Sequence, residues 1–80
     1  MAVYSIGTNG TEQMILQVTS RFKVFDMVTI NLRDGEIVNG EIVYIEKDKV
    51  HVTGPYRPIQ KIDFKDISDI NSWNPPETWR

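Results

Sequence analysis

The chain has 80 residues, 40% of them hydrophobic and 25% charged, which is the composition of one small folded domain. The formal net charge of -2 argues against a surface devoted to nucleic-acid phosphates, because such a surface gathers cations. The lack of cysteine excludes disulfides and thiol chemistry, and no apolar run approaches the roughly 18 residues that span a bilayer.

The N-terminal segment is small and polar, and we expect residues 1–10 to form a flexible leader. Met1–Ser5 lacks the basic start and the apolar core of a secretory signal, so a cytoplasmic location is expected. Asn9-Gly10 also fits a type I′ turn. The alternative to a leader is therefore a hairpin in which residues 3–6 pair with residues 13–18.

The next segment carries apolar residues near helical spacing, which predicts a short helix over about residues 12–21 with Thr11 as its cap. Leu16 lies off this stripe, and the Val-Thr pair that follows it favours a strand. The stripe consists of Met14, Ile15, Val18, Phe22 and Phe25.

From Met27 the apolar period becomes two, with Val28, Ile30 and Leu32 on one face of a half-buried strand. Asp34-Gly35 then predicts a turn into a longer strand over residues 36–46.

The alternation of this second strand breaks near Gly40, which predicts a bulge or a sharp bend there. Gly35 and Gly40 are therefore the glycines to which we assign structural roles. Lys47-Asp48-Lys49 closes a second hairpin into a strand over residues 50–52.

Gly54-Pro55 and Pro58 are expected to bracket a loop, since proline cannot donate to a strand ladder. Alternation resumes over residues 59–64, with Ile62 and Phe64 expected inside. Lys65-Asp66 then predicts a one-turn connector.

Ile67, Ile70 and Trp73 predict a last short strand, and Asn74-Pro75-Pro76 ends the regular structure. The whole pattern is typical of a mainly β domain, with an N-terminal helix or arm and five short strands closed into a small barrel. We expect one domain over residues 11–73 and a C-terminal tail over residues 74–80.

The run from Leu32 to Glu46 resembles the first motif of the Sm and Sm-like barrels, with Asp34-Gly35 at the first hairpin and Gly40 five residues later. The RNA-contacting loop of that family has an Asp-x-x-x-Asn pattern, and the asparagine is missing from residues 46–50 here. The second motif, an Arg-Gly step near the last hairpin, has no match in residues 60–65.

The second half of the chain looks more like the YolD-like proteins of Gram-positive bacteria and their phages. Gly40–Ile45 corresponds to the Gly-x-Ile-x-x-Ile strand of that family, and Ile62–Ile70 to its Ile-x-Phe-x-Asp-Ile-x-x-Ile close. The match covers about half the chain, and most matched positions are core residues and turn glycines. The resemblance implies an SH3-like or Sm-like barrel and an accessory role beside DNA-damage polymerases.

Candidate catalytic and metal-binding residues are few. His51 is the sole histidine, and without cysteine or a second histidine it is expected to be an ordinary outward-facing strand residue. Asp63, Asp66 and Asp69 recur every third residue but lack the ligand density and the glycine of a calcium loop. The sequence therefore predicts no enzyme, no metal and no cofactor.

Aromatic residues supply the more informative candidates. Tyr56 lies beside Arg57 in the expected loop, and Trp73 and Trp79 flank the double proline. Exposed aromatics next to arginine are typical of partner surfaces. The alternative is that the tail folds back and plugs one mouth of the barrel.

We therefore expect a non-enzymatic interaction or regulatory module that binds a protein partner through Tyr56, Arg57, Trp73 and Trp79 and associates with further copies of itself. The alternative is a barrel that binds RNA or single-stranded DNA through Lys47, Arg57 and Lys61.

Overall fold

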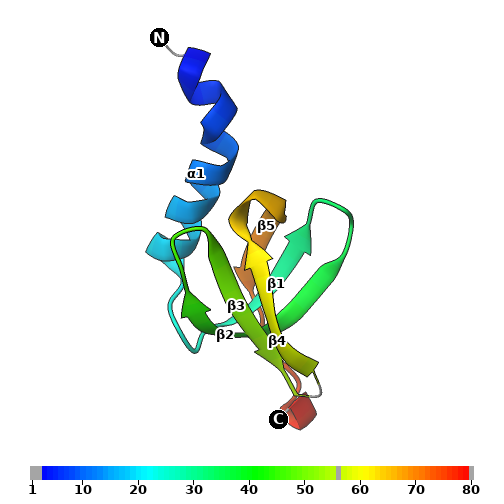
Figure 1. The fold of residues 1–80 in the computed structure, drawn as a ribbon. Helices are drawn as coiled ribbons and strands as arrows, with labels where there is room; N and C mark the ends of the chain where they lie inside the picture. Colours follow the sequence, from blue (N-terminus) through cyan, green and yellow to red (C-terminus); the bar gives the residue numbers. More distant parts are fainter. Residues whose placement is uncertain (1–2, 56, 80) are drawn as a thin grey trace.

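The computed structural model describes residues 3–55 and 57–79, with side chains from residue 11 onward. One helix precedes five strands, and of two short 3-10 turns one lies between the last two strands and the other follows them (Figure 1). The elements are α1 (Val3–Arg21), β1 (Met27–Leu32), β2 (Ile37–Ile45), β3 (Lys49–Gly54), β4 (Arg57–Asp63), η1 (Phe64–Asp66), β5 (Ile67–Ser72) and η2 (Glu77–Trp79).

The five strands form one antiparallel sheet in the order β4-β3-β2-β1-β5. This confirms the mainly β fold class, and it confirms the strands expected on both sides of the Asp34-Gly35 turn. Strand β5 follows β4 in the chain but lies at the far edge of the sheet, next to β1.

The expected closure into a barrel is wrong, since β4 and β5 are the two ends of the sheet and do not pair within the described strands. The three-residue turn η1 carries the chain from one edge to the other. Phe64 is fully buried in this turn, and its N–H donates to the carbonyl of Asp48. The connection between the two edges is therefore anchored in the core by Phe64.

Helix α1 begins at Val3, so helical backbone continues through the segment predicted as a leader. The hairpin alternative around Asn9-Gly10 is wrong, because both of its expected strands are helical. Each residue added to an existing helix gains one hydrogen bond, whereas a new nucleus is unfavourable. The first turns of α1 extend beyond the sheet (Figure 1). Within the described residues, no helix combines the length and the apolar composition that a membrane span requires.

The second half of α1 anchors the helix to the sheet. Met14 and Val18 in α1 and Phe22, the residue that follows it, recur every four residues and are all buried, as their spacing predicts for one face. They share one core with residues from all five strands and from η1. The core consists of Met14, Val18, Phe22, Val28, Ile30, Val38, Ile42, Val50, Val52, Ile62, Phe64, Ile67 and Ile70.

Gly40 has a different role from the expected bend. Val38, Gly40 and Ile42 all lie on the buried face, so the alternation of β2 is intact there. A Cβ atom on Gly40 would lie 2.4 Å from the Thr53 carbonyl oxygen and 2.6 Å from Val52 Cγ1. Glycine is needed because the backbone of β3 approaches too closely for any side chain.

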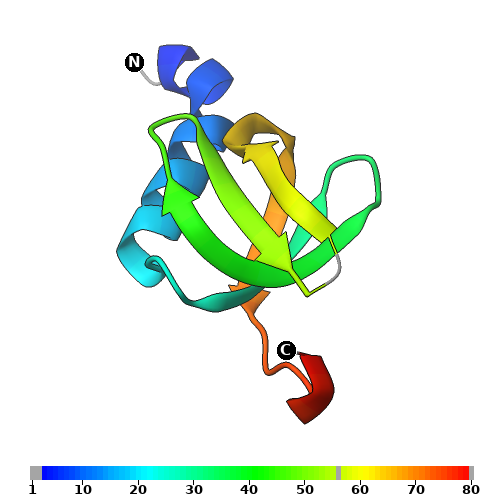
Figure 2. The same cartoon turned by 60° about the horizontal axis from the view of Figure 1, so that its bottom comes forward.

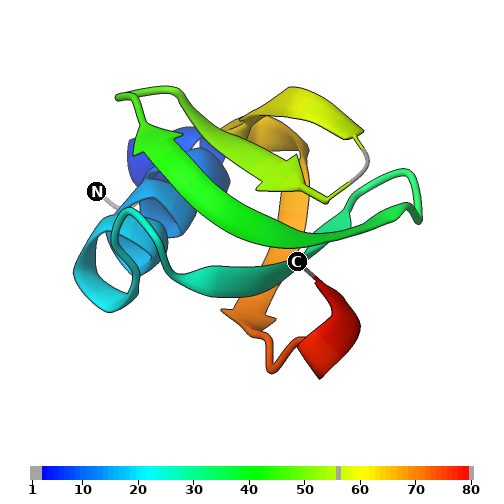
Figure 3. The same ribbon diagram turned by 90° about the horizontal axis from the view of Figure 1, so that it is seen from below.

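The irregularity of β2 lies further along the strand than expected. Its pairing with β3 shifts register between Ile42 and Tyr44, which leaves Val43 as the extra residue of a bulge. Figure 3 shows β2 curving across the sheet. The sequence pattern predicts the bulge at Gly40 and not at Val43, because a glycine on the buried face interrupts the alternation of apolar residues in the same way as a bulge does.

Two turn predictions have different outcomes. The Asp34-Gly35 turn is confirmed, with Gly35 at a φ of 97° and the Glu36 N–H donating to Asp34 Oδ1 at 2.9 Å. Pro58 was expected to bound a loop, which is wrong, because it lies inside β4. Strand β4 is an edge of the sheet, where a residue without an N–H is tolerated.

Phe25 lies in the link between α1 and β1 with a φ of 83°, the left-handed region that bulky side chains disfavour. Its N–H donates to the Ile42 carbonyl at 2.7 Å, and the Ile42 N–H donates to the Asp26 carbonyl at 2.9 Å. These bonds hold the link beside β2. The Phe25 side chain is 73% exposed, so packing offsets little of the backbone strain.

We predict that Gly40→Ala lowers the free energy of unfolding by roughly 1–3 kcal/mol, because the new methyl group meets the Thr53 backbone and overpacks the strand pair. Backbone preference alone would have the opposite sign, since alanine stabilises a strand interior by up to about 1 kcal/mol relative to glycine. Urea unfolding measures the change. Gly54→Ala is the matched control, since a Cβ there would lie 3.9 Å from the Asn39 carbonyl oxygen, an ordinary van der Waals distance. Equal stability of the two variants would show that β2 and β3 are not in close contact at Gly40.

We also predict that Phe25→Asn raises the free energy of unfolding by roughly 1 kcal/mol, because asparagine tolerates the left-handed region and an exposed ring contributes little packing. Phe25→Ala is the control, since alanine removes the same ring without relieving the backbone. An asparagine variant no more stable than the alanine variant in urea unfolding would contradict the strain at this position.

Candidate functional site

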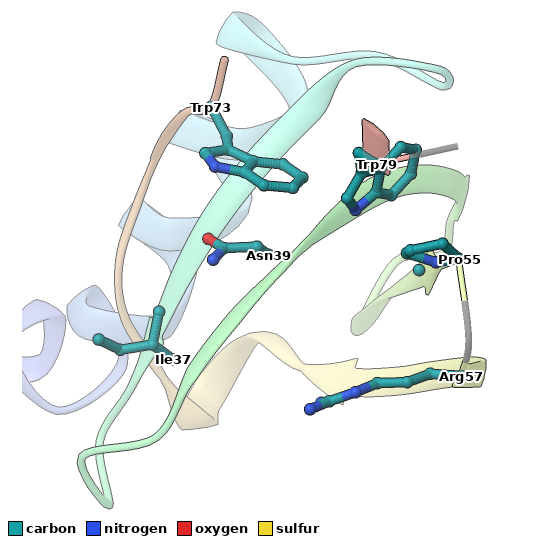
Figure 4. Close-up of a pocket in the computed structure, with 7 residues that line it drawn as sticks. Ile37, Asn39, Pro55, Arg57, Trp73 and Trp79 are labelled. Carbon is teal, nitrogen blue, oxygen red and sulfur yellow. The ribbon is translucent and has the colours of Figure 1, made fainter. Parts of the chain in front are cut away.

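The candidate site is a groove at one end of the sheet, where the C-terminal segment lies beside the β3–β4 turn (Figure 4). It has a volume of about 300 Å³, at the lower end of the range for ligand sites. We call it the tryptophan groove, and define it by Ile37, Asn39, Gly54, Pro55, Arg57, Trp73 and Trp79.

The two tryptophans form one wall of the groove. Trp73 directly follows β5, and its backbone N–H donates to the Met27 carbonyl at 3.0 Å, which ties the start of the tail to β1. Trp79 lies in η2, where its backbone N–H donates to the Pro76 carbonyl at 3.0 Å. Figure 2 shows this turn beyond the end of β5.

The indole rings pack edge to face, with centroids 5.6 Å apart and planes at 83°. This is a preferred geometry for an aromatic pair. It stabilises the packing of the tail against the start of the C-terminal segment by more than the burial of the ring surfaces alone would. Both residues are half-buried, so each ring still presents part of its surface to solvent. The pair therefore forms an apolar wall on an accessible site.

The opposite side of the groove is formed by Arg57 and Ile37, with Asn39 between the two sides (Figure 4). Arg57 is exposed at the start of β4, and it forms no salt bridge within residues 3–55 and 57–79. The Asn39 Oδ1 accepts a hydrogen bond from Thr29 Oγ1 at 2.6 Å, which fixes the amide on the outer face of the sheet. Ile37 is 62% exposed.

The groove has the chemistry of a binding site. Its described side chains supply apolar surface, one guanidinium and one amide, and none of them is a general acid, a general base or a nucleophile. Tryptophan and arginine are the residues most enriched where interfaces gain their binding energy.

The structure brings together three of the four residues predicted to bind a partner, Arg57, Trp73 and Trp79. Tyr56 lies outside the described residues. The alternative, a tail that folds back and plugs one mouth of a barrel, is half right. The tail does fold back, but Trp79 packs on Trp73 and lines an open groove instead of filling a barrel.

The cations of the nucleic-acid alternative are dispersed. Lys47 lies in the β2–β3 turn, Lys61 lies within β4 opposite His51, and Arg57 lies at the far end of the same hairpin. Because a strand rises about 3.3 Å per residue, the length of β3 separates Lys47 from Arg57 by roughly 20 Å. Lys61 is not among the residues that line the groove with Arg57.

His51 has partners that the sequence pattern did not predict. Its Nε2 pairs with a carboxylate oxygen of Glu46, and its ring packs edge to face with Tyr44 at a centroid distance of 5.2 Å. His51 lies on the outer face of β3, opposite to the buried Val50 and Val52, as the alternation predicts. The β2 bulge places Tyr44 opposite His51, so the half-buried imidazole is a cross-strand pairing residue on that face. The proximity of Glu46 follows from the hairpin, but the bulge left no recognisable signal in the sequence.

Metal-ligand geometry does not occur among the residues that the structure describes, where no three histidine, aspartate or glutamate side chains converge on one point. No protein-family model matches the chain, and the search of curated proteins finds no significant match. The likeness to the YolD-like and Sm-like families therefore remains a prediction from the sequence.

We predict no measurable affinity for nonspecific duplex DNA at about 150 mM salt, where charge interactions are screened over roughly 8 Å. The protein has a net charge of -2, and its dispersed cations cannot release many counterions at once. Fluorescence anisotropy with a labelled duplex measures this. Saturable binding at low micromolar protein would contradict the prediction and favour the nucleic-acid alternative.

Proposed function

We propose that this protein is a non-enzymatic interaction module that binds a protein partner through the tryptophan groove. The observation that carries the proposal is the accessible, edge-to-face pair of Trp73 and Trp79 beside Arg57, whose guanidinium forms no salt bridge with the described residues. An aromatic pair of fixed geometry loses little conformational entropy on binding, and arginine adds a directional contact.

Binding to RNA or single-stranded DNA is the alternative, because bases also stack on tryptophan. The position of Lys47 and Lys61 away from the groove favours the protein partner, since a strand of nucleic acid needs cations along its path. An accessory role in a Gram-positive bacterium or a phage rests on the sequence resemblance alone.

The module is further proposed to associate with copies of itself through its sheet edges. Among the described strands, β4 and β5 each have a single neighbour, and such edges are templates for strand addition. Strand β4 carries Pro58 and the charged residues Arg57, Lys61 and Asp63, whereas β5 carries only Asp69. The β5 edge is therefore the less protected of the two.

The partner hypothesis predicts a groove-dependent capture. Immobilised wild-type protein should retain a specific protein from nuclease-treated native lysate, and Arg57→Ala and Trp79→Ala should each lose it, because each removes one wall of the groove. Ile59→Ala is the control, since Ile59 is 55% exposed on the same strand as Arg57 but does not line the groove. Equal capture by all variants, or capture that nuclease abolishes, would contradict the proposal.

Self-association predicts a mass above that of the monomer in light scattering at high micromolar concentration. Ser68→Pro should lower this mass, because proline within β5 disturbs the exposed ladder. Ser68→Ala is the control for loss of the Ser68 hydroxyl, which donates to the Asn31 carbonyl at 3.0 Å. A monomer mass for the wild-type protein would exclude edge pairing.

A further inference from the structure

The charge of the tryptophan groove limits what it can bind. Arg57 is the sole charged residue among the described residues that line it. A guanidinium presents a planar fork of N–H donors that matches the two oxygens of a carboxylate. Because Arg57 forms no salt bridge with the described residues, this donor fork is available to a ligand.

The geometry of the two tryptophan rings determines which apolar groups fit against the groove wall. Since Trp73 and Trp79 meet at 83°, the wall combines the face of one ring with the edge of the other. A proline ring packs well on an indole face and loses no side-chain rotamer freedom when it is immobilised. Pro55 and the exposed side chain of Ile37 extend the apolar surface on either side.

The size and the polar contacts favour an extended chain. About 300 Å³ accommodates a few side chains rather than the surface of a folded domain. Asn39 uses its oxygen to accept from Thr29, which leaves its amide N–H groups to donate to a backbone carbonyl. Proline-rich segments hold an extended conformation before binding, so little ordering entropy opposes their association.

We propose that the tryptophan groove binds an extended acidic segment of a partner protein in which a carboxylate lies beside proline. The carboxylate pairs with Arg57, the proline ring packs against the tryptophan wall, and Asn39 donates to the backbone between them. This inference rests on the proposed function and adds the chemical class of the partner.

Intrinsic fluorescence tests the proposal directly, because both tryptophans of the chain line the groove. The full-length protein is titrated with the peptide acetyl-Pro-Pro-Glu-Pro-Pro-amide, which has no aromatic residue of its own. We expect a saturable change in tryptophan emission. Replacement of the peptide glutamate by lysine, or of its prolines by alanine, should weaken binding at least about tenfold, as the loss of a charge-assisted bond or of the ring contact requires.

Variants of the protein locate the contact. Arg57→Gln should weaken binding of the acidic peptide about tenfold, and Arg57→Glu should reverse the preference toward the lysine peptide. Lys61→Gln is the matched control, because it removes an exposed cation from the same strand outside the groove. Circular dichroism of each variant confirms that the fold is retained.

Equal binding of the glutamate and lysine peptides, an unchanged affinity of Arg57→Gln, or the lack of any saturable change would overturn the proposal. Arg57-dependent binding of oligo-dT in place of the peptide would overturn it in favour of nucleic acid. Failure of the peptides together with groove-dependent capture of a protein would refute the peptide class alone. Failure of both would refute the proposed function as well.

Discussion

The close approach of β2 and β3 at Gly40 is the constraint on which the rest of the structure depends. Gly40 lies on the buried face between Val38 and Ile42, with the Thr53 carbonyl where a side chain would otherwise lie. The absence of a side chain lets the two strands close together over the core. The neighbouring residues Asn39 and Gly54 line the tryptophan groove.

The open sheet explains how so short a chain combines a core with accessible edges. One face of the five strands is covered by the second half of α1 and by the buried Phe64 of η1. The connection through η1 places β5 next to β1, so Trp73 emerges at the end of the sheet where Asn39 and Arg57 lie. The topology that leaves the β4 and β5 edges unpaired is thus also the topology that assembles the groove.

Much of this fold is predictable from the sequence because it follows local periodicity. The alternation of Val28 and Ile30 and the four-residue spacing of Met14 and Val18 each identify a buried face without knowledge of the tertiary fold. Aromatic residues beside Arg57 were likewise recognisable as candidates for a partner surface.

The features that the sequence did not predict depend on contacts between distant segments. The local pattern predicts a bend or bulge at Gly40, since nothing in it indicates that the Thr53 backbone lies against this residue. The sequence predicts a loop at Pro58, since nothing local indicates that β4 is an edge strand, where proline is tolerated. The left-handed backbone of Phe25 is held by bonds to β2, and no propensity indicates it.

The most direct test of this account is nuclear Overhauser spectroscopy of the protein in solution. The account predicts cross-peaks from the Gly40 α protons to the Val52 methyl group, and between the ring protons of Trp73 and Trp79, whose centroids are 5.6 Å apart. Both sets should be present in the same sample. Loss of the Gly40 contacts while the Trp73–Trp79 contacts persist would contradict the claim that the groove depends on the approach of β2 and β3.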